Sequence, residues 1–440
     1  MDSLARLGGA IESALIEEPF VRVSGVVREV APTHYRVVGL SAAVKLGDRV
    51  GLRAGAQTTT GEVVRVDEQT AIIKPFDDRV PVGIGMVASR LGTMCLHPAK
   101  SWKGRVVNAL GEPVDGKGAL ARGDRPMPTD RAPPAAMTRS RIEKPLRTGV
   151  RVVDIFTPFC RGQRIGIFAG SGVGKSTLLS MIARSTGFDT VVVALVGERG
   201  REVREFLEGP LADNRARAVT VVATGDESPM MRRLALLSAT AIAEYFRDCG
   251  DSVLLIADSV TRYAHAARDV ALAAGEPAVA RGYTPSVFSD LPRLLERAGP
   301  GPIGAGSITG VFAVLVDGDD HNDPVADAIR STLDGHIVLD RAIADQGRYP
   351  AVNVLASISR LADLVWTPEQ RELVRRLKTM IARFEDTRDL RLMGGYHAGS
   401  DAELDHAVVM VPRIYEALRQ DFSTRASADA FADLAQILRP

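Results

Sequence analysis

A glycine-rich segment that ends in a lysine and a serine carries the most specific chemistry in this chain. The apolar run Ile165–Phe168 leads into the segment, and an apolar-periodic stretch, Leu178–Ala183, follows it. Glycines let backbone N–H groups curl around a phosphate, and a helix N-terminus adds partial positive charge. Lys175 can reach the β- and γ-phosphates, and the hydroxyl of Ser176 can bind Mg²⁺. We therefore expect a nucleotide site with Mg²⁺, whereas the plainer interpretation is a glycine-rich turn with an exposed lysine.

One position departs from the phosphate-loop pattern. Gly-x-x-x-x-Gly-Lys-Ser/Thr calls for glycine at 169, and this chain has Ala169. Three glycines and the Lys-Ser pair remain between an apolar run and a helical pattern, so the assignment stands. The residues expected to bind the nucleotide here are Gly170, Ser171, Gly172, Val173, Gly174, Lys175, Ser176 and Thr177.

Polar residues also follow other apolar runs, and they need a common scaffold. Continuous apolar strands separated by helical stretches predict an α/β fold with a mainly parallel sheet covered on both faces. Ligands bind at the carboxyl ends of the strands in such sheets, so these polar residues are expected to form one site. The expected strands are Ile165–Phe168, Val191–Val196, Val219–Ala223, Val253–Ala257, Val311–Val316 and Val352–Ala356.

Three of these polar residues suit phosphoryl transfer from a bound nucleotide, as in a kinase, a GTPase, a helicase or transport motor, or an ATP synthase relative. Asp258 closes an apolar strand downstream of the phosphate loop, where a carboxylate holds Mg²⁺ through water. Glu198 is placed to orient or deprotonate the attacking water, although a glutamate at a helix N-terminus is an equal alternative. Arg360 suits the charge that develops on a transferring phosphoryl group, and its alternative is an ion-paired surface residue.

The composition excludes several classes of protein. The chain has 440 residues, a net charge of +1 and 5% aromatic residues, so no basic, aromatic-interleaved strip for a nucleic acid is expected. Its three cysteines are far apart, which fits a reducing cytoplasm. The sequence has no apolar stretch of membrane-spanning length, no signal peptide and no guanine-reading Asn-Lys-x-Asp motif. We predict a cytoplasmic protein.

The chain divides into four predicted segments. Residues 1–18 form a helical segment that either packs on its own domain or docks onto a partner. Residues 19–95 hold short β-rich pieces typical of a small antiparallel barrel. Residues 96–365 form the nucleotide domain, which begins with a proline- and glycine-rich ordered linker. Residues 366–440 are helical, with helices expected at Pro368–Thr387, Ala402–Leu418 and Ala426–Leu438.

Several of these motifs together resemble the rotary ATP synthase superfamily. The run Gly200–Phe206, Gly-Arg-Glu-Val-Arg-Glu-Phe, and the run Leu291–Gly299 point to its type III protein-export branch, nearest to the flagellar export ATPases. That branch also lacks the glycine that Ala169 replaces. The other segments that carry the resemblance are Phe168–Thr177, Val196–Arg199, Ala257–Tyr263, Gly282–Phe288 and Leu333–Leu339.

The resemblance implies a RecA-like, P-loop nucleotide domain between a β-barrel and C-terminal helices, in a homohexameric ATPase. The roles it implies follow the family motifs. Glu198 is the catalytic base, Lys175 binds the β- and γ-phosphates, and Ser176 binds Mg²⁺. Glu202 and Asp258 organise the water shell of Mg²⁺, while Arg199 and Arg262 lie near the phosphates, Tyr349 stacks on adenine, and Arg360 reaches into the neighbouring subunit's site.

The same resemblance implies a role in protein export. We expect ATP hydrolysis that energises flagellar export, and Val316–Pro324 looks flagellar; the alternatives are a virulence secretion ATPase and a nucleotide-binding ring without turnover. The expected partners are further copies of this chain, a regulator or stator-like protein at residues 1–18, export substrates with their chaperones, and an export gate. The expected location is the cytoplasmic face of the inner membrane.

Overall fold

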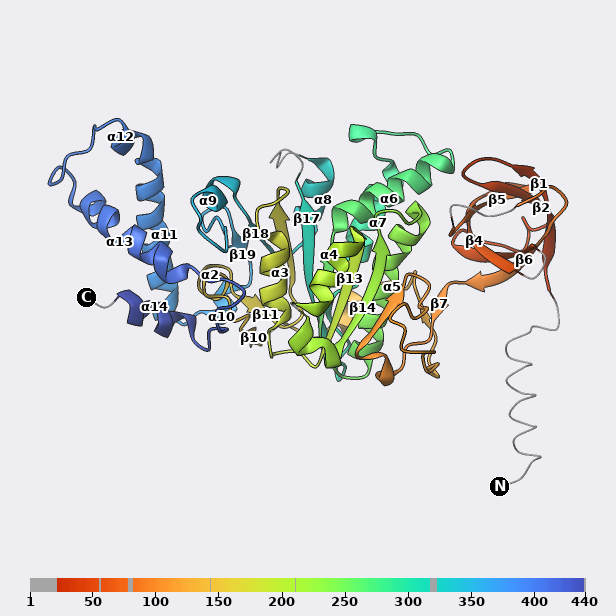
Figure 1. Cartoon of the computed structure of the whole chain (residues 1–440), viewed down its shortest axis with the longest axis horizontal. Coiled ribbons are helices and arrows are strands. Elements are labelled where there is room, and N and C mark those ends of the chain that lie inside the picture. The colour runs from red at the N-terminus through yellow and green to blue at the C-terminus, as the bar shows by residue number, and fades with distance from the viewer. Residues whose placement is uncertain are drawn as a thin grey trace, which may run out of the picture. The chain divides into compact units, whose positions relative to one another are not determined.

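The computed structural model of the chain describes residues 22–438, apart from 55–56, 78–81, 143, 210 and 317–322. The predicted helical segment 1–18 and most of the acidic stretch in Val316–Pro324 therefore lie outside the described residues. The chain divides into two compact units (Figure 1). One contains the residues up to Met94 together with Asp269–Glu276, and the other contains Cys95–Arg268 and Pro277–Pro440.

The first unit is a closed six-stranded antiparallel barrel, as the sequence predicts. Its strands pair in the order β1-β2-β5-β4-β3-β6. Alternating residues point inward, so Val27, Val37 and Val63 are fully buried in a core that Tyr35 and Leu52 complete. The strands are β1 (Ser24–Val30), β2 (Tyr35–Val38), β3 (Asp48–Ala54), β4 (Gln57–Val66), β5 (Thr70–Pro75) and β6 (Val87–Thr93).

A mainly parallel sheet forms the centre of the second unit, which confirms the predicted α/β fold. The strand order is β19-β18-β12-β17-β15-β13-β14-β8, with β16 paired to β17. Every residue of β13 and β15 is buried, as continuous apolar strands require. These strands are β8 (Arg105–Asn108), β12 (Arg164–Ala169), β13 (Thr190–Glu198), β14 (Ala218–Thr224), β15 (Ser252–Asp258), β16 (Gly299–Pro300), β17 (Ser307–Leu315), β18 (Gly335–Val338) and β19 (Ile358–Ser359).

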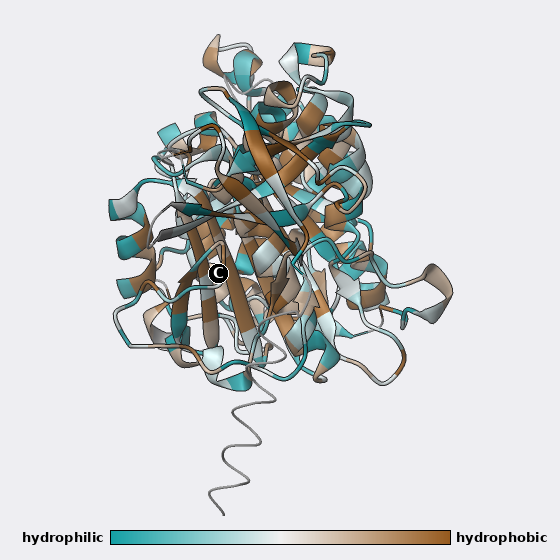
Figure 2. Ribbon diagram, turned by 90° about the vertical axis from the view of Figure 1, so that its right-hand side faces the viewer, coloured by the Kyte–Doolittle hydropathy of each residue, from teal (hydrophilic) through white to brown (hydrophobic). Residues whose placement is uncertain are grey.

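Helices cover both faces of this sheet because parallel crossovers are right-handed. Two helices, α3 and α4, follow β12 and β13 in the chain and pack in one apolar cluster with these strands. The connection through α5 leads back along the sheet from β14 to β15, and α5 contacts β13, β14 and β15. Strands are mostly brown in Figure 2, whereas helices carry both brown and teal stretches. The helices of this layer are α2 (Arg151–Phe156), α3 (Lys175–Ala183), α4 (Gly200–Glu208), α5 (Pro229–Asp248), α6 (Val260–Ala273), α7 (Pro285–Leu295), α8 (Pro324–Thr332) and α9 (Arg341–Asp345).

The proline- and glycine-rich stretch 100–150 supplies an edge strand to the sheet as well as a linker. Within it, β8 pairs in parallel with β14. Most of the remaining residues have no regular structure. The other short elements of the unit are β7 (Cys95–Leu96), β9 (Met127–Pro128), β10 (Pro145–Leu146), β11 (Phe159–Cys160) and the 3₁₀ turns Lys100–Trp102, Ala136–Thr138, Ala212–Arg217 and Ala280–Gly282.

The strand predicted at Val352–Ala356 is wrong. Val352 makes a single isolated bridge with Leu339, and the chain then turns. The turn forms because the side-chain oxygen of Asn353 accepts hydrogen bonds from the backbone N–H groups of Leu355 (3.1 Å) and Ala356 (3.0 Å). Val352 and Val354 are buried in this loop, whereas Leu355 is exposed, and β18 and β19 form this edge of the sheet instead.

The C-terminal segment is helical, as predicted. α11 begins with a capping box between Thr367 and Gln370. α13 packs against α11 through apolar residues that recur at helical spacing. The last helix begins at Ala430, not at the predicted Ala426. The helices are α10 (Ala362–Val365), α11 (Pro368–Asp386), α12 (Arg388–Leu392), α13 (Ala402–Leu418) and α14 (Ala430–Leu438). Among the described residues, none of the helices combines the length and apolar character needed to cross a membrane.

Candidate active site

The phosphate-loop segment connects the end of β12 to the start of α3. Gly172 and Gly174 have φ angles of +78° and +94°, which a residue with a side chain rarely adopts. α3 starts at Lys175, directly after Gly174, so the unpaired N–H groups of its first turn face the loop. This is the arrangement that binds a phosphate at a helix N-terminus.

Charged side chains from three strand ends meet beside this loop. The ammonium group of Lys175 donates a hydrogen bond to the carboxylate of Asp258, at the end of β15, and lies 3.8 Å from Oε1 of Glu198. Glu198 ends β13 and lies 3.5 Å from the guanidinium of Arg262, on α6. The side chains of Lys175 and Glu198 are each only 11% exposed. The structure thus brings together four of the predicted site residues.

The position of Glu198 depends on the glycine that precedes it. Gly197 has a φ angle of +69°, and the pairing of β13 with β14 shifts register between Val196 and Glu198. A Cβ atom on Gly197 would lie 2.9 Å from Cδ of Arg262, so a larger residue would displace that arginine. The bulge therefore turns Glu198 toward Lys175 and leaves room for Arg262.

The carboxyl of Glu198 has an unusual protonation equilibrium. Burial, together with the charge of Asp258, raises the pKa of Glu198 to about 7, against the opposing effect of Lys175 and Arg262. The protonated carboxyl of Glu198 donates a hydrogen bond to Glu202, which raises the pKa of Glu198 and lowers the pKa of Glu202. Oε1 of Glu198 is buried and makes no hydrogen bond. Glu198 is therefore able to change protonation state near neutral pH, as a general base requires.

A cavity of about 390 Å³ opens next to α3. Its oxygen-bearing side chains include Ser176, Glu198, Glu202 and Asp258, which are the hard ligands that Mg²⁺ prefers. Within the described part of the chain, no three His, Cys, Asp or Glu side chains are grouped to ligate a metal alone. These residues fit a Mg²⁺ ion that keeps several waters and also binds substrate phosphates. The remaining lining residues are Thr177, Ser180, Leu195, Val203, Glu205, Phe206 and Phe422.

Three predicted residues lie away from this charged centre. The side chain of Arg199 is 73% exposed and lies 3.5 Å from Glu202. Tyr349 is 41% exposed and lies against the phosphate loop, since a Cβ atom on Gly174 would be 3.5 Å from its ring. Arg360 is exposed and follows β19, where its N–H donates a 2.9 Å hydrogen bond to the carbonyl of Asp334. Its predicted position at the end of a Val352–Ala356 strand is wrong because that strand does not form.

The aromatic ring of Phe422 is a site feature that the sequence analysis missed. Phe422 lies between α13 and α14 and lines the cavity beside Ser176 and Thr177. The guanidinium carbon of Arg184, just after α3, lies 4.7 Å from the centre of its ring, and Nη1 of Arg184 donates a 2.6 Å hydrogen bond to its carbonyl. The available signal was a lone aromatic residue inside the polar run Gln420–Thr424.

Comparison with known proteins identifies the family. Residues 149–359 match the ATP synthase alpha/beta family, nucleotide-binding domain, and residues 366–436 match the T3SS EscN ATPase C-terminal domain. A flagellum-specific ATP synthase of Rhizobium meliloti (strain 1021) is 57% identical over 437 residues, which cover 99% of this chain and 94% of that protein. Another, from Agrobacterium fabrum (strain C58), is 59% identical over 416 residues, which cover 94% of this chain and 88% of that protein.

A solved structure has the same architecture. The assembled ATPase EscN from the type III secretion system of enteropathogenic E. coli superimposes with a TM-score of 0.88 at 38% sequence identity. The match covers 94% of this chain and all of that chain. The chain belongs to the ATP synthase alpha/beta family, in its branch of ATPases that serve flagellar type III protein export.

Proposed function

We propose that this chain hydrolyses Mg·ATP in a site shared between two identical subunits, and that the hydrolysis energises the export of flagellar proteins. The observation that carries the proposal is the buried carboxyl of Glu198 beside Lys175 and Asp258. The two relatives that are 57% and 59% identical to this chain are flagellum-specific ATP synthases, which favours flagellar export over virulence secretion.

The charged centre supplies the groups that phosphoryl transfer needs. Ser176, and through water Asp258 and Glu202, would hold Mg²⁺, which would neutralise charge on the phosphates. The backbone N–H groups of the loop and the ammonium of Lys175 bind the β- and γ-phosphates. Glu198 takes the proton from the attacking water. The oxygen of that water bonds to the γ-phosphorus, and the bond between the γ-phosphorus and ADP breaks. Arg262 keeps the Glu198 carboxylate in place through the 3.5 Å contact.

Two aromatic side chains offer surfaces for the nucleotide base. Tyr349 lies against Gly174 of the phosphate loop, and Phe422 lines the cavity beside Ser176 and Thr177. Adenine stacks on aromatic surfaces of this kind. Arg199 supplies positive charge near the phosphates after the assembly closes around it.

Arg360 acts from the neighbouring subunit. It is exposed and does not line the cavity of its own chain, and a head-to-tail contact that closes gives a ring. The EscN relative is described as assembled, and a second EscN structure contains its central stalk EscO. We infer a homohexamer that binds a stalk-like or regulatory partner, with residues 1–18 as the docking segment for the regulator. The other inferred partners are export substrates, chaperones and the export gate at the inner membrane.

The substitution Glu198→Gln tests this function. We expect the variant to keep Mg·ADP affinity and to lose ATP hydrolysis by about a hundredfold or more, because general-base catalysis contributes about 10²–10⁴-fold. Wild-type specific activity should also rise with protein concentration as rings form. Equal, near-zero hydrolysis in wild type and Glu198→Gln would favour a nucleotide-binding ring without turnover and would refute the proposal.

A further inference from the structure

The loop that carries Tyr349 connects the nucleotide site to the C-terminal helices. On one side its ring lies against Gly174 of the phosphate loop. On the other side its carbonyl accepts a 2.9 Å hydrogen bond from the backbone N–H of Gln420, directly after α13. Because the ring is partly exposed, packing alone does not hold it, and its position depends on the backbone at residues 348–349.

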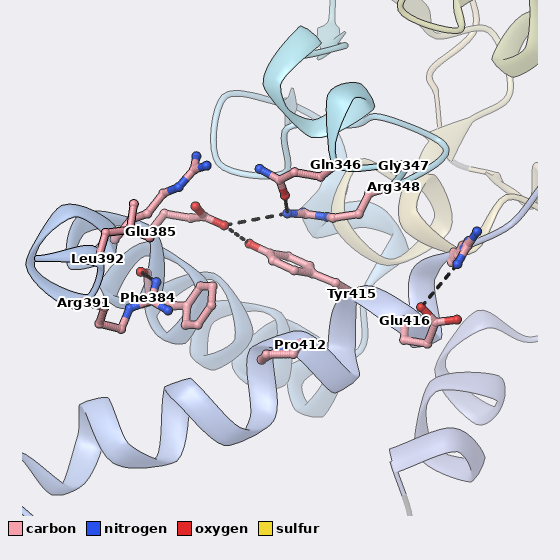
Figure 3. A pocket seen from close by; sticks show the side chains of 12 residues that line it. Gln346, Gly347, Arg348, Phe384, Glu385, Arg391, Leu392, Pro412, Tyr415 and Glu416 are labelled. Carbon is pink, nitrogen blue, oxygen red and sulfur yellow. Dashed lines mark hydrogen bonds and ion pairs between the residues drawn. The ribbon is translucent and has the colours of Figure 1, made fainter. Parts of the chain in front are cut away.

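The side chain of Arg348 anchors this backbone. Its guanidinium carbon lies 3.3 Å from the centre of the Tyr415 ring, on α13. Its Nη1 donates a 2.9 Å hydrogen bond to Oε1 of Gln346 and lies 3.9 Å from Oε1 of Glu385, on α11. Figure 3 shows these side chains converging on Arg348 at the edge of a cavity of about 500 Å³. A planar guanidinium suits this combination of stacking and directed hydrogen bonding.

Glu385 and Tyr415 in turn join the two helices to each other. Oη of Tyr415 donates a 2.5 Å hydrogen bond to Oε1 of Glu385. The rings of Phe384 and Tyr415 meet edge to face, with their centres 6.3 Å apart. Burial and this hydrogen bond raise the pKa of Tyr415, so its hydroxyl remains a donor. Arg348 therefore rests on a cluster that moves only if α11 and α13 move.

We propose that Arg348 is a positioning residue that holds the Tyr349 ring for base stacking, and that it couples nucleotide affinity to the position of α11 and α13. The inference rests on the proposed function, since it needs a nucleotide base at Tyr349. Coupling of this kind is reciprocal, so nucleotide binding also biases where α11 and α13 lie. A partner protein that shifts these helices would then change the affinity for the base without contacting the phosphates.

The test compares a ligand that has a base with one that lacks it. Isothermal titration calorimetry on the full chain measures the affinities for Mg·ADP and for Mg·pyrophosphate. We expect Arg348→Gln to weaken Mg·ADP about five- to twentyfold, because base–aromatic stacking is partly lost, and to leave Mg·pyrophosphate unchanged. Arg348→Lys keeps the charge but loses the planar stack, so its Mg·ADP affinity should lie between the affinities of wild type and Arg348→Gln.

Two further variants keep the test decisive. Tyr415→Leu removes the ring under Arg348 without changing the loop, and it should shift the ratio of the two affinities in the same direction. The matched control is Arg388→Gln, which lines the same cavity from α12 and should leave both affinities unchanged. The inference about Arg348 is overturned if Arg348→Gln and Tyr415→Leu weaken both ligands equally, or if neither variant changes the affinity for either ligand. These results would leave the proposed function standing. A wild-type chain that binds neither ligand overturns the proposed function with it.

Discussion

The ion pair between Glu244 and Arg297 gives a quantitative test of how the nucleotide-binding unit is stabilised. Glu244, on α5, is fully buried, and the Arg297 side chain is 2% exposed. Two hydrogen bonds of 3.0 Å and 2.9 Å join the guanidinium to the carboxylate. Nη1 of Arg297 also donates a 2.6 Å hydrogen bond to the carbonyl of Thr129. Because both side chains are buried, water cannot solvate one of them if its partner is removed.

Removing one member should cost more than removing both. Glu244→Leu leaves a buried guanidinium without a counter-charge, and breaking such a pair costs about 3–5 kcal/mol. The double variant Glu244→Leu, Arg297→Met replaces the pair with apolar side chains of similar size, which is often close to neutral. It still removes the hydrogen bond that Arg297 donates to the Thr129 carbonyl, and a hydrogen bond from a charged group contributes about 1.5–3 kcal/mol. We expect the free energy of unfolding to fall most in the single variant.

Urea unfolding followed by circular dichroism measures these differences. The matched control is Glu372→Gln, an exposed glutamate on α11 that pairs with Arg375 and Arg376 and should change the free energy by about 1 kcal/mol or less. The reasoning is refuted if Glu244→Leu unfolds at the same urea concentration as wild type, or if the double variant is less stable than the single variant.

Three further outcomes are expected. Phe422→Ala should weaken Mg·ADP about tenfold through lost stacking, as measured by fluorescence titration, whereas Phe422→Tyr should keep the affinity; equal binding by all three would exclude the ring from the base site. Asp258→Asn should abolish ATP hydrolysis at every Mg²⁺ concentration in a turnover assay. A variant with normal turnover would contradict a metal role for Asp258. The hydrogen bond from Arg105 holds the pKa of Asp115 well below its usual value, so acid should reduce stability as the pH falls below about 4. Asp115→Asn should show a smaller loss over that range, which acid titration of the unfolding midpoint checks.

Periodic apolar patterns made most of the fold predictable. The central strands β12, β13, β14, β15 and β17 appear in the sequence as continuous apolar runs because both of their faces are buried. Val352–Ala356 has the same appearance but forms a turn. A short apolar run cannot separate a strand from a buried loop, and the side chain of Asn353 decided this case.

The candidate site divides in the same way. Lys175, Glu198 and Asp258 lie at strand ends or at a helix start, so local sequence was enough to predict that they converge. Phe422 and Arg348 come from the C-terminal segment and from a loop. A lone aromatic residue in a polar run marks Phe422 as unusual, but no local pattern predicts that either residue approaches the nucleotide site. Their positions follow from the packing of α13 and its flanking loops on the nucleotide domain, which is a long-range property.

The contact between Lys175 and Asp258 has a consequence for the order of ligand entry. The ammonium of Lys175 donates a hydrogen bond to the carboxylate of Asp258, beside which the water shell of Mg²⁺ is expected to sit. Metal ion and ammonium therefore compete for one anion, and free Mg²⁺ gains little by entering first. A phosphate offers the ammonium another partner and brings the metal with it. We expect metal and nucleotide to enter as a single complex rather than in random order.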